Sequence, residues 1–157
     1  MSSPAQPSDP GPTPPDKPCR WALVVDDEPA NRDFLMRLLE QANYEVQGAG
    51  QGSEALHLAE AHDQAGLVVI DNKLPDIDGI ELVARMRARY PQARIIMATM
   101  LDEPALMRQA FENGCDVFLV KPHGFMELFR RLQTSKPGED RLARLIIDQY
   151  GPRPYRG

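Results

Sequence analysis

The chain has 157 residues, 42% of them hydrophobic and 26% charged, so it is long enough for one domain with a full core. Its net charge of −5 argues against a nucleic-acid surface, and no apolar run approaches the ~20 residues that a membrane helix needs. Two distant cysteines, Cys19 and Cys115, argue against a disulfide framework or a thiolate zinc site and favour a reducing, cytoplasmic setting.

The first predicted segment, residues 1–19, is a proline-rich arm. Seven of its first 18 residues are prolines, and no large apolar side chain follows the initiator Met1. Such a composition cannot bury a core, so we expect a disordered arm, with a proline-rich partner motif as the alternative. The arm has neither the basic start nor the apolar middle of a secretory signal.

The second predicted segment, residues 20–134, is the folded body, in which apolar runs alternate with helical patterns. In chain order these predict a strand at 22–25, a helix at 28–42, a strand at 44–47, a helix at 53–62, a strand at 67–70, a helix at 80–90, a strand at 94–98, a helix at 103–113, a strand at 117–120 and a helix at 124–133. Pro29 suits a first helical turn, Ser53 is the expected N-cap of the second helix, and Gly114 is the expected stop of the fourth.

Strands that alternate with helices predict an α/β fold, a doubly wound parallel sheet with helices on both faces. Ligands of such sheets bind outside the carboxyl ends of the strands. The chemistry of this chain is therefore expected directly after residues 25, 70, 98 and 120.

Polar side chains stand at all four of these positions. They are Asp26, Asp27, Glu28, Asp71, Thr99 and Lys121. Converging carboxylates repel one another and need a cation, and an all-oxygen ligand set favours Mg²⁺. A carboxylate beside Mg²⁺ and an ammonium group can attack phosphorus and form an acyl phosphate, while a hydroxyl binds a phosphate oxygen.

Four motifs at these positions together resemble the signatures of the response-regulator receiver domain of two-component signalling. They are LVVDDE at 23–28, VVIDNKLPDIDG at 68–79, IIMATM at 95–100 and FLVKP at 118–122. The resemblance covers residues 20–133 and implies a five-stranded flavodoxin-like sheet of order 2-1-3-4-5 with Mg²⁺ as cofactor. It also implies a phosphohistidine donor, either a sensor histidine kinase or a histidine phosphotransfer protein.

The resemblance assigns a role to each site residue. Asp71 matches the phosphoacceptor, Asp27 the direct Mg²⁺ ligand, Asp26 its acidic partner, Lys73 the backbone-carbonyl ligand, Thr99 the switch hydroxyl, Lys121 the phosphate-binding lysine in a cis bond to Pro122, and Phe118 the aromatic switch.

Three residues are predicted to modulate the rate of phosphoryl loss or the amplitude of the switch. Lys73 and Leu101 flank the entry to the phosphoryl group in receivers, and neither resembles a residue that positions attacking water, so we expect a long-lived phosphorylated form. Met100 stands where the family prefers alanine, and its bulk is expected to restrict the switch.

Plainer interpretations exist for single residues. Asp27 could cap a helix, and Phe118 could be core packing alone. The pair Asp76 and Asp78 resembles part of a calcium-binding loop. The first and twelfth positions of that loop would be Leu74 and Arg85, which have no carboxylate, so the sequence argues against a calcium-binding loop. Asp78 is expected to cap a helix, in a capping box with Glu81, and Asp76 to be solvated.

The third predicted segment, residues 135–157, is a tail with one amphipathic helix over residues 139–149, which either packs on the body or contacts a partner, including a second copy. The expected function is a phosphoacceptor response regulator without turnover as an enzyme, whose downstream protein target is unknown. The alternatives are a constitutive adaptor and an aspartyl-phosphate phosphatase, and the latter is disfavoured because Lys73 replaces its second aspartate.

Overall fold

The computed structural model describes residues 19–121, 124–134 and 144–156. The strands are β1 (Trp21–Val25), β2 (Glu45–Ala49), β3 (Leu67–Asp71), β4 (Arg94–Thr99), β5 (Val117–Val120), β6 (Leu145–Asp148) and β7 (Gly151–Pro154). The helices are α1 (Pro29–Gln41), α2 (Gly52–Glu60), α3 (Gly79–Arg89), α4 (Pro104–Glu112) and α5 (Phe125–Thr134). None of the helices in these ranges is long and apolar enough to span a bilayer.

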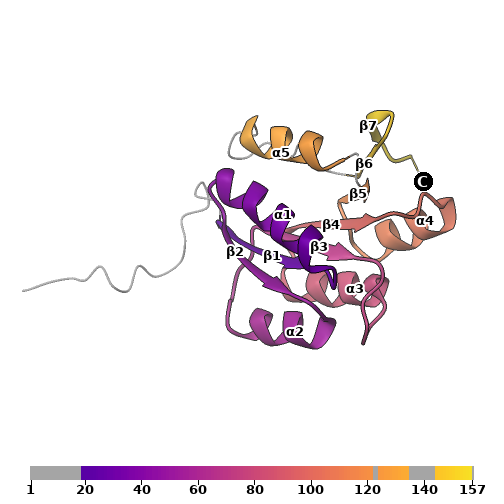
Figure 1. The fold of residues 1–157 in the computed structure, drawn as a ribbon. Helices are drawn as coiled ribbons and strands as arrows, with labels where there is room; N and C mark the ends of the chain where they lie inside the picture. The colour runs from indigo at the N-terminus through magenta and orange to yellow at the C-terminus, as the bar shows by residue number, and fades with distance from the viewer. Residues whose placement is uncertain (1–18, 122–123, 135–143, 157) are drawn as a thin grey trace, which may run out of the picture.

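The strands form one sheet in the order β2-β1-β3-β4-β5-β6-β7 (Figure 1). Neighbouring strands from β2 to β6 are parallel, and β7 pairs with β6 antiparallel. The predicted doubly wound sheet of order 2-1-3-4-5 is thus confirmed, and two C-terminal strands extend it beyond β5.

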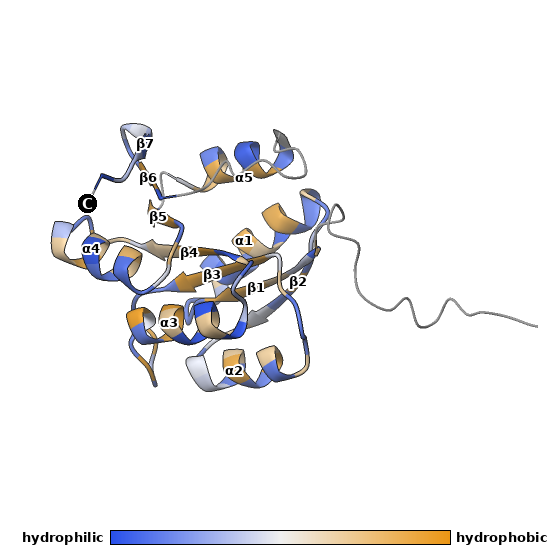
Figure 2. Cartoon of the chain, turned by 180° about the vertical axis from the view of Figure 1, so that it is seen from behind, coloured by the Kyte–Doolittle hydropathy of each residue, from blue (hydrophilic) through white to orange (hydrophobic). Residues whose placement is uncertain are grey.

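Helices cover both faces of the sheet, with α1 and α5 on one side and α2, α3 and α4 on the other (Figure 1). Successive side chains of a strand point to opposite faces, so each strand contributes to two cores. In β1, Leu23 and Val25 join the core under α2, α3 and α4, while Ala22 and Val24 join the core under α1 and α5. The central strands are accordingly apolar along their length (Figure 2), as burial on both faces requires.

Most of the expected helix ends are found in the structure. Pro29 occupies the first turn of α1, and the Asp78 carboxylate caps α3 by accepting the N–H of Ile80 at 3.0 Å. Gly114 follows α4 with a φ of +113°, a conformation that a side chain would strain.

The start of α2 differs from the expectation that Ser53 would cap it. The helix begins one residue earlier, and its cap comes from Asp76, far along the chain. The Asp76 carboxylate accepts the N–H of Gly52 at 2.7 Å and of Ser53 at 2.9 Å. Asp76 is exposed, as predicted, but it ties the loop before α3 to the start of α2.

The predicted tail helix over residues 139–149 is wrong in its second half, because Leu145–Asp148 is strand β6; residues 139–143 lie outside the described ranges. The β-branched Ile146 and Ile147 are buried beside β5, where a strand gains both hydrogen bonds and apolar contacts. Gly151, with a φ of +97°, then allows the chain to return as β7. The proline-rich residues 1–18 also lie outside the described ranges.

Candidate functional site

Strand register brings the predicted site residues to one edge of the sheet. Val25 pairs with Ile70, so Asp26 and Asp71, one residue further on, stand level on β1 and β3. Asp71 is level with Ala98, the residue before Thr99. Thr99 pairs with Val120, and Lys121 follows directly. Parallel strands place all these ends on the same side, so residues nearly 100 positions apart converge.

Three carboxylates meet at this edge. Asp26, Asp27 and Asp71 each offer one oxygen, and these atoms lie within 4.8 Å of one another. Asp26 is buried, Asp71 is half-buried and Asp27 is exposed. The cluster therefore has one side open to a donor or an ion and one side shielded from water.

Lys121 supplies the positive charge at the buried side of the cluster. Its Nζ lies 3.0 Å from Oδ2 of Asp26 and 3.5 Å from Oδ1 of Asp71. Only 8% of this lysine is exposed, so its attraction to the two carboxylates is weakly screened. The ammonium group of Lys121 alone does not balance the charge of three ionised carboxylates.

The Asp71 carboxyl has a raised pKa, chiefly because burial disfavours its charged form. The neighbouring charges of Asp26 and Asp27 raise it further, while Lys121 and a backbone hydrogen bond from Lys73 lower it. The ionised form of Asp71 thus stands in an unfavourable environment, which a cation at the open side would relieve.

Thr99 is buried beside this cluster, and its hydroxyl oxygen accepts the N–H of Leu101 at 3.1 Å. Accepting that bond leaves the hydroxyl proton able to donate to another oxygen. Leu101 is half-buried, whereas Met100 is 72% exposed and projects into solvent.

The loop between β1 and α1 is fixed by a contact that the sequence analysis missed. Oδ1 of Asp26 accepts the N–H of Glu28 at 2.9 Å, and Nη1 of Arg32 donates to the backbone carbonyl of Asp26 at 2.7 Å. A Cβ at Gly48 on the neighbouring strand would lie 3.1 Å from Cδ of Arg32. The nearest atom to such a Cβ is Sδ of Met36 at 2.6 Å, so no pattern in the sequence pointed to this arginine.

The loop after Asp71 is held close to the start of α3. The N–H of Gly79 donates to the carbonyl of Asn72 at 3.1 Å, and Lys73 forms an isolated β-bridge with Asp78. A Cβ at Gly79 would lie 2.5 Å from the carbonyl oxygen of Asp71, so only glycine fits there. The exposed Lys73 lines a groove between this loop and α4.

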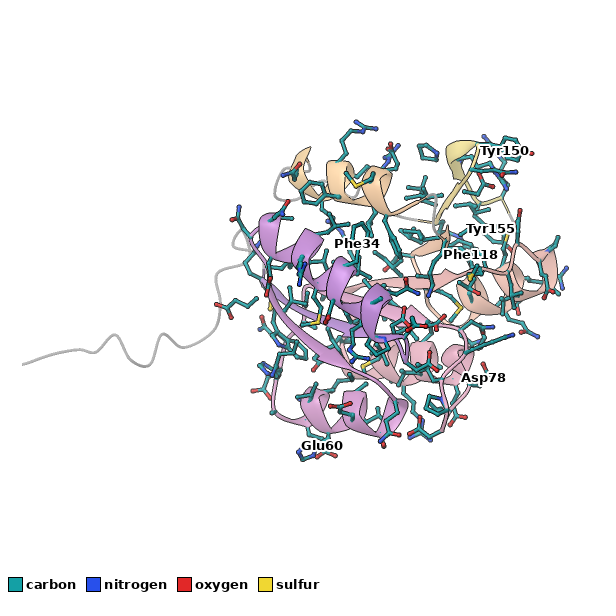
Figure 3. The ribbon with its side chains drawn as sticks, viewed as in Figure 1. Phe34, Glu60, Asp78, Phe118, Tyr150 and Tyr155 are labelled. Atoms are coloured by element: carbon teal, nitrogen blue, oxygen red, sulfur yellow. The ribbon has the colours of Figure 1, made fainter. Side chains whose placement is uncertain are left out.

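Phe118 is fully buried in the core under α4, on the strand that ends at the site (Figure 3). Its role as a switch remains a prediction. Cys115 is a buried core residue. The predicted cis bond involves Pro122, which lies outside the described residues.

The carboxylate cluster fits a divalent hard cation. Its donor atoms are all oxygens, they are close enough to share one ion, and Asp27 is exposed on the open side. Mg²⁺ takes one or two carboxylates and keeps several waters, which suits a half-open site. The three carboxylates of Asp26, Asp27 and Asp71 are therefore compatible with Mg²⁺, and the Lys73 carbonyl stays a predicted ligand.

Comparisons with known proteins agree with this geometry. The response regulator receiver domain family matches residues 22–133. The chain is 35% identical over 112 residues to the transcriptional regulatory protein SrrA of Staphylococcus aureus, covering 71% of this chain and 46% of SrrA. It thus spans about half the length of such relatives.

Solved structures show the same likeness. A response regulator from Burkholderia pseudomallei, described with a phosphorylated aspartic acid, calcium ion and citrate, is 33% identical with a TM-score of 0.67, over 73% of this chain and 67% of that one. A CheY-like receiver domain from Methanospirillum hungatei is 29% identical with a TM-score of 0.67, over 73% and 91%. With its fold, its acidic cluster and these matches, the chain belongs to the response regulator receiver domain family.

Proposed function

We propose that this chain is a phosphoacceptor response regulator that takes a phosphoryl group on Asp71 from a phosphohistidine. The donor would be a sensor histidine kinase or a histidine phosphotransfer protein. The observation that carries the proposal is the cluster itself, in which Asp71 lies within 4.8 Å of two further carboxylates and 3.5 Å from the Lys121 ammonium. The phosphorylated aspartic acid of the Burkholderia relative supports it by analogy.

In the proposed step an Asp71 carboxylate oxygen attacks phosphorus and the phosphorus–nitrogen bond of the donor breaks, so the imidazole leaves with the bond's electron pair and takes up a proton. Lys121 stabilises the charge on the phosphoryl oxygens, and the Thr99 hydroxyl donates to one of them. A Mg²⁺ ion held by Asp26, Asp27, Asp71 and the Lys73 carbonyl would supply charge neutralisation and orientation. The protein phosphorylates itself and is not an enzyme with turnover.

The consequence of phosphorylation would be a change in the surface of α4, β5 and α5, through Thr99 and Phe118. Phosphorylation acts on such a surface by shifting the populations of two arrangements, and a protein partner reads the difference. The side chains of Lys73 and Leu101 are the proposed reason for a slow loss of the phosphoryl group. A lifetime no longer than that of the Leu101→Glu variant would contradict this last point.

The test is the intact mass of the chain after incubation with Mg²⁺ and a small acyl-phosphate donor. We expect a gain of one phosphoryl group in the parent and in Asp33→Asn, which changes an exposed carboxylate on α1. Asp71→Asn should gain none. If neither small donors nor a panel of phosphorylated histidine kinases modifies the parent, the proposal fails and a constitutive adaptor becomes the better description.

A further inference from the structure

The surface that phosphorylation is proposed to change is covered by the chain itself. We define the C-terminal hairpin as residues 144–156, which contain β6, its turn and β7. Strand β6 pairs in parallel with β5 from Val117↔Leu145 to Leu119↔Ile147, and the N–H of Leu145 donates to the carbonyl of Asp116 at 2.9 Å. The edge of β5 is therefore occupied, between α4 and α5 (Figure 1).

The hairpin is anchored in both cores. Ile146 is 3% exposed and joins the core of Phe118 under α4, and Ile147 is fully buried and joins the core of Leu119 under α5. At Gly124, just before α5, an added Cβ would lie 2.6 Å from Cγ of Leu119 and 3.0 Å from Cγ2 of Ile147, so strand β5 and the hairpin both pack tightly against this glycine. Close contacts on both faces indicate a specific fit.

An aromatic contact closes the far end of the hairpin onto α4. The Tyr155 ring stacks on Phe111 with centroids 4.1 Å apart and 14° between their planes. The Arg144 guanidinium lies 5.8 Å from the Phe111 ring and 5.4 Å from the Tyr155 ring, and the N–H of Tyr155 donates to the carbonyl of Arg144 at 2.7 Å. Figure 3 shows Tyr155 on the same side of the molecule as Phe118, with Tyr150 at the outer end of the hairpin.

This packing restricts Phe118. Phe118 and Ile146 are register partners on neighbouring strands, and their side chains share one core with Phe111. Phe118 has no exposed surface in this packing, and Tyr155 packs against the same core. The docked hairpin consequently keeps Phe118 buried.

We infer that the C-terminal hairpin is the immediate binding partner of the α4–β5–α5 surface and that its docking favours the phosphorylated arrangement. The inference rests on the proposed function, to which it adds that phosphorylation, like docking of the hairpin, favours the buried Phe118 side chain seen here. If both events favour a buried Phe118, they are linked, and linkage is reciprocal. Phosphorylation should tighten the hairpin, and loosening the hairpin should weaken phosphoryl binding.

The test is calorimetric titration of the full chain with beryllofluoride, a phosphoryl analogue, in Mg²⁺. Tyr155→Ala should bind about threefold to tenfold more weakly, which is the range that one lost aromatic contact allows. Arg144→Gln, which keeps the stacked rings, should change affinity in the same direction by less. Tyr155→Phe keeps the stacked ring and should bind with the affinity of the parent. Tyr150→Ala changes a side chain of the same hairpin that is 82% exposed, and it should also bind with the affinity of the parent.

Amide exchange gives a second readout, because the segment from Leu145 to Arg156 should exchange more slowly when the analogue is bound. Equal or tighter binding by Tyr155→Ala, or hairpin exchange that is unchanged or faster, would overturn the inference and leave the proposed function intact. A parent chain that neither binds the analogue nor gains a phosphoryl group would overturn both.

Discussion

Replacing the phosphoacceptor by its neutral isostere, Asp71→Asn, should make the metal-free protein more stable. Besides the cost of burying the Asp71 charge, charges at most 4.8 Å apart repel by at least ~3.5 kcal/mol at an effective dielectric constant of about 20, and Asp71 has two such neighbours, Asp26 and Asp27. The attraction between the Lys121 ammonium and the Asp71 carboxylate, 3.5 Å apart, offsets ~4.7 kcal/mol of this repulsion. Screening reduces the contribution of the exposed Asp27, so we expect a gain of about 1–2 kcal/mol, or a rise in Tm of about 3–6 °C.

The assay is urea and thermal unfolding at pH 7 in EDTA, with Asp33→Asn as the matched control on an exposed surface. The raised pKa of Asp71 fixes the sign of the pH dependence. Its ionisation destabilises the fold above the folded-state pKa, and the effect disappears as the pH falls below the unfolded-state value. Mg²⁺ should stabilise the parent more than Asp71→Asn. An Asp71→Asn variant no more stable than the parent in EDTA would refute the reasoning.

Three further outcomes are expected. Arg87→Met should cost about 2 kcal/mol in urea unfolding, because Arg87 pairs with Asp116 at 2.7 Å, whereas Arg85→Met on the exposed side of α3 should cost little; equal losses would contradict this. Asp76→Ala should lower the free energy of unfolding at neutral pH. The hydrogen bonds that the Asp76 carboxylate accepts from backbone N–H groups lower its pKa, so the difference from the parent should vanish as the pH falls through that pKa. A pH-independent difference would contradict the capping role. Burial raises the pKa of the Cys115 thiol to about 12, so native protein at pH 8 should take up at most one iodoacetamide and urea-unfolded protein two, as read by mass; a double adduct on native protein would show that Cys115 is accessible.

The five-stranded core and its acidic edge were predictable because both follow from alternation along the chain. Once β3 and β4 are parallel neighbours, the side chains after their ends must meet, whatever their separation in sequence. Asp71, Thr99 and Lys121 could therefore be grouped before any coordinates were known. Their exact separations could not, because these depend on the register and twist of the strands.

Contacts between segments that share no pattern were not predictable. Asp76 has no local signal as a cap for α2, since the amides it accepts belong to Gly52 and Ser53, more than 20 positions earlier. Arg32 likewise donates to the carbonyl of Asp26, and this contact depends on the rotamer of a long side chain, which the sequence does not specify. Only the packed fold chooses such partners.

The tail was misjudged because its spacing fits two periods. Leu142, Leu145, Ile146 and Gln149 lie at helical spacing, but Ile146 and Ile147 are also adjacent β-branched residues before a turn that ends in Gly151. Short apolar runs of this kind are decided by what they pack against. Here the segment packs against the edge of β5 and pairs with it, which favours the strand.

The register of β7, the last strand of the sheet, determines which backbone groups its outer edge presents. Pro152 and Pro154 pair with Ile147 and Leu145 on β6, and the Tyr155 N–H points back toward β6, so alternation turns the two proline nitrogens outward. A proline nitrogen carries no hydrogen, and the outer rim at these two positions has no amide to offer an incoming strand. An incoming strand would receive no hydrogen bond from these two positions, which disfavours edge-to-edge pairing of copies of this protein at this rim. Among the described residues, the opposite rim of the sheet is β2, whose sequence contains no proline to oppose strand pairing.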